Sequence, residues 1–435
     1  MAKSKSKPSR VQVRFDYTEP DRLRAIESSA GKLLDKLNQP APDGSVWSLA
    51  ESFWPALGMA EYKGKPVQNI ALRLVPLSRI GQMEGKSGSL VLIGYLADAD
   101  DRGKPHSHPV VIKTRDLKKG DKLKEEYDNA LSIKPFAYDQ KDNLAIPVHF
   151  DSDLDVFSVL WSIFSPSSPV WPVGVTDNSE DALQVSDLRD QLVASSKDAI
   201  STLEATFDIL RNLHHRLNKA SSQVRSIGDE YWKYFRKPDS DVWAAWRTEW
   251  GDKEFVQDAG GKFPNPFKVA KKLKSKKAAL HIGAIHGDLH PGNIVLADGK
   301  PRIIDFGWAQ DSAHIAKDFV LMECNLRFHT VRPQLRQADV HALSDWILWD
   351  EPIPKSLGGY ASDRAKLIQQ LREIAKNRFP DDVDWNWEYI APLFLVSLGL
   401  LRFAPLLGNQ QAAVRFTLNL SKTVNDLLDG KKVKK

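Results

Sequence analysis

Four polar residues lie close together in residues 285–310, which read IHGDLHPGNIVLADGKPRIIDFGWAQ: His286, Asp288, Asn293 and Asp305. Carboxylate and amide oxygens are the ligands that Mg²⁺ takes in proteins. An aspartate beside a metal-bound phosphoryl group can accept or orient the proton of an attacking hydroxyl. These residue types therefore indicate phosphoryl transfer, with Asp288 as the base or orienter and Asn293 and Asp305 as the metal ligands.

A β-hairpin is expected to position the two metal ligands. Short apolar runs lie on either side of Asp298-Gly299, a pair that favours a two-residue hairpin turn. Such a turn places Asn293 beside Asp305 at one end of the hairpin. A polar surface hairpin is the alternative interpretation, but it does not explain why the polar side chains converge on that end.

The order HGDLHPGN and then IDFG resembles the catalytic and metal loops of the protein-kinase-like fold, in the form used by aminoglycoside phosphotransferases and choline kinases. The resemblance implies an α+β, bilobal fold with a small antiparallel-sheet N-lobe and a mainly helical C-lobe, which binds ATP and Mg²⁺. It also implies that His286 braces the catalytic loop and that Asp318 supports it. Bacterial kinase-like modules attached to conflict or signalling systems share these motifs.

The N-lobe is predicted from period-two patterns, with strands at residues 71–80, 89–96, 109–114 and 156–164. By resemblance, Gly85 and Gly88 belong to a turn over the nucleotide phosphates, and Lys113 contacts the α- and β-phosphates. A strand-end lysine in water is the alternative for Lys113. A P-loop at Gly85 is excluded because Ile80 stands where that motif needs glycine.

A helix is predicted after Lys113, because apolar residues recur there at helical spacing: Leu123, Tyr127, Ala130 and Leu131. At about 100° per residue, Glu126 falls near this buried face, whereas Glu125 points away from it. In kinase-like folds the phosphate-contacting lysine pairs with a glutamate of this helix. Glu126 is therefore the predicted partner of Lys113.

The chain is divided into an N-terminal extension (1–68) with a basic tail, an N-lobe (69–164), and a C-lobe (165–435) with an insertion at about 221–280. The apolar pattern of the extension predicts an amphipathic helix and an apolar cluster. The extension is a candidate docking element for a protein partner. Residues 161–164 are the candidate adenine hinge. Residues 97–109, with two histidines and three aspartates, are interpreted as a long solvated loop rather than a metal site.

Several C-lobe residues are interpreted as structural. Apolar spacing over residues 200–217 predicts a long amphipathic helix, with His214 and His215 as helix-end residues. The stripe of Trp243, Trp246 and Trp250 is interpreted as core packing rather than a substrate site. The apolar run 390–401 is too short to span a bilayer and predicts a buried helix.

The composition fits a reducing compartment. The chain has 435 residues and one cysteine, Cys324, so no internal disulfide framework exists, and Cys324 is interpreted as a packed thiol. The basic N-terminus is not followed by an apolar segment of the kind found in signal peptides. We expect a cytoplasmic protein without a membrane segment.

The formal charge of +5 is unevenly distributed. Residues 1–10, 268–277 and 431–435 carry 14 basic residues and no acid, which leaves −9 for the rest of the chain. This pattern is interpreted as two basic tails and one basic loop rather than a folded basic face. Such runs can hold phosphate backbones, although most are solvated segments.

These features predict an ATP- and Mg²⁺-dependent phosphotransferase that moves the γ-phosphoryl group to a hydroxyl of a small molecule or protein. No Ala-Pro-Glu motif follows Asp305, which favours a small-molecule kinase, whereas the Asp305-Phe306-Gly307 motif keeps a protein acceptor open. A catalytically weak nucleotide-binding regulatory module and a nucleic-acid-associated protein acting through its basic tails are the alternatives. The acceptor does not follow from the sequence.

Overall fold

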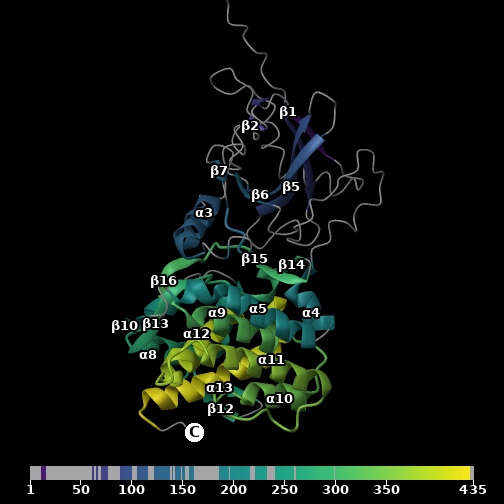
Figure 1. The fold of residues 1–435 in the computed structure, drawn as a ribbon. Helices are drawn as coiled ribbons and strands as arrows, with labels where there is room; N and C mark the ends of the chain where they lie inside the picture. Colours follow the sequence, from purple (N-terminus) through teal and green to yellow (C-terminus); the bar gives the residue numbers. More distant parts are fainter. Residues whose placement is uncertain are drawn as a thin grey trace, which may run out of the picture. The chain divides into compact units, whose positions relative to one another are not determined.

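The computed structural model describes residues 11–15, 61–62, 65–66, 70–76, 89–99, 105–115, 122–137, 140, 143–147, 149–151, 156–160, 186–194, 196–215, 221–232, 241–258, 261–297 and 299–431. The chain forms two compact units, drawn as ribbons in Figure 1. Unit 1 comprises Met1–Ser186 with Val295–Trp308, and unit 2 comprises Asp187–Ile294 with Ala309–Lys435. The domain boundaries expected from the sequence remain predictions.

Unit 1 contains a six-stranded sheet in the order β1-β4-β5-β6-β8-β7. Its strands are β1 (Val11–Phe15), β4 (Ile70–Pro76), β5 (Ser89–Ala99), β6 (Pro105–Arg115), β7 (His149–Asp151) and β8 (Val156–Leu160). Neighbouring strands are antiparallel, as expected, except that β1 pairs parallel with β4. The N-terminal segment therefore adds an edge strand that was not predicted, although its sequence VQVRF alternates apolar and polar residues. A separate short hairpin joins β2 (Glu61–Tyr62) to β3 (Lys65–Pro66).

The loop predicted at residues 97–109 is shorter than expected. The pairing of β5 with β6 continues through Ala97 and Ser107, Asp98 and His106, and Ala99 and Pro105. Strand pairing uses backbone N–H and C=O groups, so it can extend through polar residues beyond the apolar part of a strand. The prediction was wrong at both ends of the loop.

Helix α3 (Lys122–Ile133) follows β6 and continues into the short turn η2 (Lys134–Phe136). Its buried face consists of Leu123, Glu126, Ala130 and Ile133. Residues spaced by three, four and three positions lie on one side of a helix. Glu126 is therefore buried on the same side of α3 as the apolar residues.

A β-hairpin also belongs to unit 1, although the sequence placed it in the C-lobe. Strands β14 (Ile294–Ala297) and β15 (Lys300–Ile303) are joined by a turn in which Gly299 has a φ of 73°. The Ala145 N–H donates to the Ile303 carbonyl over 2.8 Å, and the Ile303 N–H donates to the Asn143 carbonyl over 2.9 Å. These backbone bonds attach the hairpin to residues 143–145. Strand β14 also pairs with β9 (Ser186–Asp187).

Unit 2 is mainly helical (Figure 1). Its main helices are α4 (Leu188–Ala194), α5 (Ser196–His214), α9 (Ala316–Cys324), α10 (Gln337–Asp345), α11 (Gly359–Lys376), α12 (Ala391–Leu400) and α13 (Gln410–Leu428). Shorter helical segments are η9 (Asn325–His329), η10 (Asn386–Ile390) and η11 (Leu401–Leu406). Helix α12 packs against α9 and α13, and all of its residues are buried.

The apolar run at 390–401 thus forms the buried helix that was predicted. Among the described residues, the segment Asn386–Ala404 is long and apolar enough to cross a membrane, with a mean hydropathy of 1.3. However, 83% of this window is buried inside the protein, as in the core helix of a globular unit.

Other structural predictions for unit 2 are also confirmed. Helix α5 ends at His214, and Cys324 is buried. Trp246 and Trp250 are buried, and the Trp246 Nε1 donates to the Leu401 carbonyl over 3.2 Å. The side chain of Trp243 lies outside the described part of the chain, as do Leu217 and the predicted helix of the N-terminal extension.

The insertion at 221–280 is folded. It contains β10 (Ser221–Ser226), α6 (Ile227–Tyr231), α7 (Asp241–Trp250), β11 (Phe255–Asp258), β12 (Gly261–Pro264) and α8 (Pro266–Leu273). Strand β10 pairs with β13 (Lys277–Ile285), which pairs with β16 (Gln310–His314). The segment 268–277, predicted to be a loop, is instead most of α8, a turn and the first residue of β13. Asn265 caps α8 by accepting from the Phe267 N–H, and Pro266 follows at its first turn, as is common in helices.

A buried ion cluster makes the stability of unit 2 depend on pH. Glu323 accepts hydrogen bonds from Arg372, Arg327 and the Tyr389 hydroxyl over 2.8 to 3.0 Å. Burial opposes ionisation of Glu323, but the two arginines outweigh it and lower its pKa from 4.5 to about 2. Because the folded-state pKa is below the unfolded value, the stabilisation is present above about pH 4.5 and is lost as the pH falls toward 2.

We expect urea unfolding to show a loss of up to about 3 kcal/mol from this group over that interval. Glu323→Gln should lack this part of the pH dependence and should already be less stable at neutral pH by roughly 3 to 5 kcal/mol, because two buried arginines lose their counter-charge. Asp363→Asn, which alters a surface ion pair with Lys366, is the control. An identical acid dependence in parent and Glu323→Gln would contradict the assignment.

Candidate functional site

Lys113 and Glu126 form an ion pair in unit 1. The Lys113 Nζ lies 2.6 Å from the Glu126 Oε1 and 2.7 Å from its Oε2. Their side chains are only 12% and 11% exposed. Lys113 comes from β6 and Glu126 from the buried face of α3, whereas Glu125 is exposed. The structure therefore brings together the lysine and the glutamate that the helical phase selected.

Asp305 lies beside this pair in the same unit. Its Oδ1 is 3.6 Å from the Lys113 Nζ, and its side chain is 44% exposed. Asp305 has a φ of 64° and is the one non-glycine residue with positive φ among the described residues. Aspartate tolerates this left-handed conformation better than most residues, but it still costs of order 1 kcal/mol. Such local strain is concentrated at functional sites and turns the carboxylate away from the regular strand direction.

The three charged groups influence one another. The pKa of Lys113 is raised because the two carboxylates outweigh the effect of burial, so the ammonium group stays charged. Burial, together with the negative charge of Asp305, raises the pKa of Glu126 from 4.5 to about 7. Two carboxylates thus compete for one lysine, and a cation bound at Asp305 would relieve the excess negative charge.

Asn129 holds the backbone that follows Asp305. Its Nδ2 donates to the Gly307 carbonyl over 2.8 Å. A Cβ built on Gly307 would lie 3.6 Å from the Glu126 Cγ, so helix α3 and this loop are in close contact. Sequence reasoning missed Asn129, although its position three residues after Glu126 places both side chains on the same side of α3.

Asp318 organises the loop of unit 2 that contains His286, Gly287 and Asp288. The backbone N–H groups of His286 and Gly287 donate to its Oδ2 and Oδ1 over 3.0 and 2.8 Å. Gly287 has a φ of 81°, which favours glycine at this turn. His286 is fully buried, and its Nδ1 accepts from the Asp288 N–H over 3.3 Å. These contacts are the bracing that the resemblance implied for His286 and Asp318.

His214 is a further residue of this cluster. Its Nε2 lies 3.0 Å from the Asp318 Oδ2, and both side chains are fully buried. Burial opposes ionisation of Asp318, but His214 and the Gly287 N–H outweigh it and hold its pKa below the ordinary value. The sequence correctly placed His214 at the end of a helix but gave no indication of this contact.

Asn293 fixes the other side of the loop. Its Nδ2 donates to the Asp288 carbonyl over 2.9 Å, and its side chain is buried. It ends the short helix η8 (Pro291–Asn293), which His290 caps by accepting from the Gly292 N–H. The backbone of Asp288 is therefore held from both sides, by His286 and by Asn293.

The predicted site residues fall into two sets. Lys113, Glu126 and Asp305 belong to unit 1, and Asp288 and Asn293 belong to unit 2. Gly85, Gly88 and residues 161–164 lie outside the described residues.

The donor set for a metal is one carboxylate and one amide oxygen. In the described part of the chain, no group of three or more His, Cys, Asp or Glu residues could hold a metal ion. The Asp305 carboxylate of unit 1 and the Asn293 amide oxygen of unit 2 are each a type of donor that Mg²⁺ takes, since this ion uses one or two protein ligands and completes its shell with phosphate oxygens and water.

The antiparallel sheet bearing a lysine, the helix bearing its glutamate, and the helical unit with the braced HGD loop define a protein of the protein-kinase-like fold, in the α+β class. The family model of ternary complex associated domain 9 matches residues 177–401, slightly more than half of the 435 residues, and the chain belongs to this family. No curated protein matches the chain.

The chain is also similar to solved kinase structures. A choline kinase from Streptococcus pneumoniae is 11% identical, with a TM-score of 0.38 over 77% of this chain and 89% of that one. Amicoumacin kinase in complex with AMP-PNP and Ca²⁺ is 13% identical, with a TM-score of 0.35 over 82% of this chain and 88% of that one. A choline kinase from Cryptosporidium parvum is 9% identical, with a TM-score of 0.33 over 83% of this chain and 91% of that one. These scores are too low to carry functional weight.

Proposed function

We propose that the protein is an ATP- and Mg²⁺-dependent phosphotransferase that moves the γ-phosphoryl group to a hydroxyl. The observation that carries this proposal is the largely buried Lys113, which is held by both carboxylate oxygens of Glu126 and lies 3.6 Å from the strained Asp305. A structural ion pair needs one carboxylate. The second carboxylate belongs to Asp305, whose side chain is exposed and whose backbone is left-handed. We infer that this carboxylate binds the metal of a metal–nucleotide complex.

Each residue has a separate role in this proposal. Lys113 contacts the α- and β-phosphates, and Glu126 keeps its ammonium group in place. Asp305 and Asn293 would hold Mg²⁺, which would supply positive charge to the transferred phosphoryl group. By the resemblance alone, Gly85 and Gly88, which lie outside the described residues, would offer backbone N–H groups to the phosphates.

Asp288 accepts or orients the proton of the attacking hydroxyl. Its backbone N–H is bound to His286 and its carbonyl to Asn293, so two buried residues hold the backbone from which the carboxylate extends. Since His286 already accepts a hydrogen bond inside the protein, it serves as a brace and not as the base.

The acceptor in this proposal is a small hydroxylated molecule, with a protein hydroxyl as the second candidate. Helix α9 begins at Ala316, eleven residues after Asp305, which leaves little room for the long regulated segment of protein kinases. A cytoplasmic location agrees with the single buried cysteine and stays a prediction.

Replacement of Lys113 by alanine tests the proposal. We expect the parent to bind ATP with Mg²⁺ in calorimetry and to transfer or release its labelled γ-phosphate. Lys113→Ala should weaken nucleotide binding by at least about tenfold, because hydrogen bonds to charged groups are worth roughly 1.5 to 3 kcal/mol.

Lys124→Ala is the matched control, because Lys124 lies on α3 and pairs with Asp128 at the surface. It should leave nucleotide binding unchanged. A parent protein that binds no nucleotide would refute the proposal, and one that binds without turnover would support a regulatory nucleotide-binding module instead.

A further inference from the structure

The insertion contains a basic surface that the proposed kinase chemistry does not use. Residues 259–287 carry seven lysines and no acidic residue. Six of them form what we call the lysine face: Lys268, Lys271, Lys272, Lys274, Lys276 and Lys277. Helix α8 buries Pro266, Val269 and Leu273. At about 100° per residue, its lysines lie on the other sides of the helix, so this charge belongs to a folded surface.

Most of the charge on the lysine face is not neutralised by ion pairs. Lys268 pairs with Glu254 over 2.5 Å. Lys272 donates to the Asn425 Oδ1, which is a neutral acceptor. Among the described residues, none of the other lysines of this face forms a salt bridge. The surface therefore keeps a concentrated positive charge, although the chain outside its three basic segments is acidic.

Exposed apolar side chains lie in the same insertion. The exposed large hydrophobic residues of the described chain are Val224 at 73%, Phe255 at 47% and Trp232 at 39%. The Lys274 Nζ lies 4.7 Å from the centre of the Trp232 ring, and the Lys262 Nζ lies 4.3 Å from that of Phe255. Two exposed aromatic rings of the insertion thus each lie beside an ammonium group, and Lys274 of the lysine face contacts Trp232.

Backbone contacts bring Trp232, Val224 and the lysines together. Ser226 stands opposite Lys277 in the β10–β13 pair, and Val224 stands opposite Ala279, two residues along and thus on the same sheet face. The Ser226 Oγ donates to the Lys274 carbonyl over 2.6 Å. The start of α6, which leads to Trp232, is therefore fixed directly beside Lys274.

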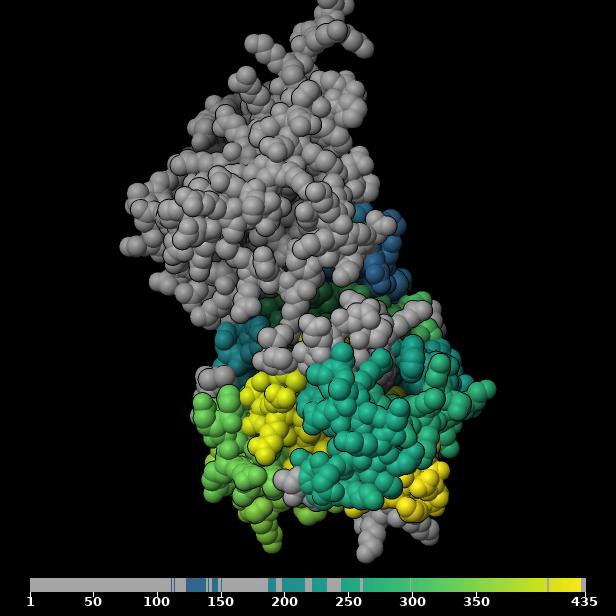
Figure 2. Space-filling view, turned by 180° about the vertical axis from the view of Figure 1, so that it is seen from behind, coloured from purple at the N-terminus to yellow at the C-terminus, as the bar shows by residue number. Residues whose placement is uncertain are grey.

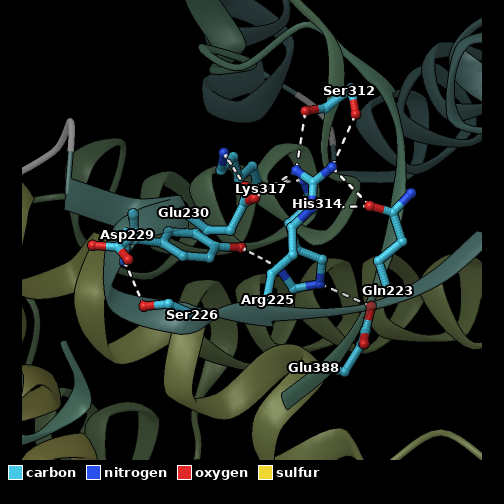
Figure 3. A network of polar contacts seen from close by, with 10 residues as sticks. Gln223, Arg225, Ser226, Asp229, Glu230, Ser312, His314, Lys317 and Glu388 are labelled. Carbon is cyan, nitrogen blue, oxygen red and sulfur yellow. Dashed lines mark hydrogen bonds and ion pairs between the residues drawn. The ribbon is translucent and has the colours of Figure 1, made fainter. Parts of the chain in front are cut away.

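A polar network connects the elements that carry this surface. Figure 3 shows Arg225 bound to Glu230, Gln223 and Ser312, which ties β10 to α6 and β16. The Tyr231 hydroxyl is 2.8 Å from the His314 Nδ1, and the His314 Nε2 is 2.8 Å from Glu388. Figure 2 shows the insertion, in teal, spread over a broad part of one face of unit 2. A ligand would meet a preformed surface, which lowers the ordering cost of binding.

We propose that the lysine face, together with Trp232, binds single-stranded nucleic acid, with phosphates on the lysines and an unpaired base stacked on the indole ring. Lysine-lined surfaces with accessible aromatic rings are how proteins hold single strands without reading sequence. A lipid surface fits less well, because the apolar side of α8 is already buried and cannot insert. An acidic peptide would use the charges but would gain little from the ring. This inference is independent of the proposed kinase activity.

Fluorescence anisotropy with the full chain and a labelled oligothymidylate of about 15 nucleotides tests the charge component. The parent should bind at about 50 mM salt and more weakly at about 200 mM. Lys271→Gln with Lys274→Gln should weaken binding and should reduce the slope of log K against log salt by about 1.4, since each phosphate contact on a single strand contributes about 0.7. Lys366→Gln with Lys376→Gln removes the same charge from exposed positions of α11 and should have little effect.

Trp232→Ala tests the stacking component. It should weaken binding by about tenfold with the salt slope unchanged, because it removes a ring and no charge. The basic tails are present in every variant, so they cannot produce this difference. No binding by the parent, equal losses in the α11 control, or unchanged binding in both test variants would overturn the proposal. The proposal would also be overturned if polyglutamate or anionic vesicles displaced the labelled oligothymidylate as effectively as the unlabelled strand does.

Discussion

Replacement of Asp288 by asparagine is expected to reduce phosphoryl transfer by about 10²- to 10⁴-fold, the range that a positioned acid–base residue contributes. The substitution keeps the size of the side chain and both backbone hydrogen bonds of residue 288, to His286 and to Asn293. It removes the negative charge of the side chain and with it the ability to accept a proton. Nucleotide affinity should stay within about twofold of that of the parent, because in this proposal Asp288 contacts the attacking hydroxyl and not the phosphates of the nucleotide.

The measurement is the rate of labelled γ-phosphate transfer or release at saturating ATP and Mg²⁺, with affinity measured separately by calorimetry. Asp311→Asn, at an exposed position of β16 in the same unit, is the matched control and should retain the parent rate. Turnover that survives Asp288→Asn would remove the assigned role of Asp288. A parent without turnover would instead count against the proposed enzyme as a whole.

The residues that could be predicted from the sequence are those fixed by local geometry. Glu126 could be separated from Glu125 because the periodicity of α3 sets the direction of each side chain, and Glu126 indeed contacts Lys113. The contact of His214 with Asp318 could not be predicted, because it joins residues 104 positions apart. Only the packing of α5 against α9 and the catalytic loop brings these two side chains together.

The prediction of a loop at residues 268–277 was wrong because the lysines were given too much weight. Six lysines in ten residues outweighed the weaker signs of a helix, which are Asn265 and Pro266 at its start and the buried pair Val269 and Leu273. A high density of charged residues predicts that their side chains are exposed to solvent, but it does not predict whether the backbone forms a helix or a loop. The parallel strand β1 was missed because residues 11–15 were interpreted together with the basic tail, although Val11, Val13 and Phe15 alternate with polar residues as in a strand.

Replacement of Asp318 by asparagine is expected to loosen the catalytic loop and slow turnover without removing any group that contacts substrate. The carboxylate accepts from the N–H groups of His286 and Gly287 and is bound to His214. An asparagine keeps one acceptor oxygen, and its amide group opposes one of these donors. The buried loop should lose about 3 kcal/mol of hydrogen-bond energy, since bonds to charged groups are the stronger ones.

Hydrogen exchange at the His286 and Gly287 amides measures this effect directly and should accelerate by roughly a hundredfold. Asp339→Asn is the control, because Asp339 is also buried and also accepts a glycine N–H, from Gly358, but lies on α10. That variant should lose stability while exchange at the catalytic loop and the turnover rate stay near those of the parent. Unchanged exchange at Gly287 in folded Asp318→Asn would mean that the Asn293 contact to Asp288, rather than the buried carboxylate, holds the loop in place.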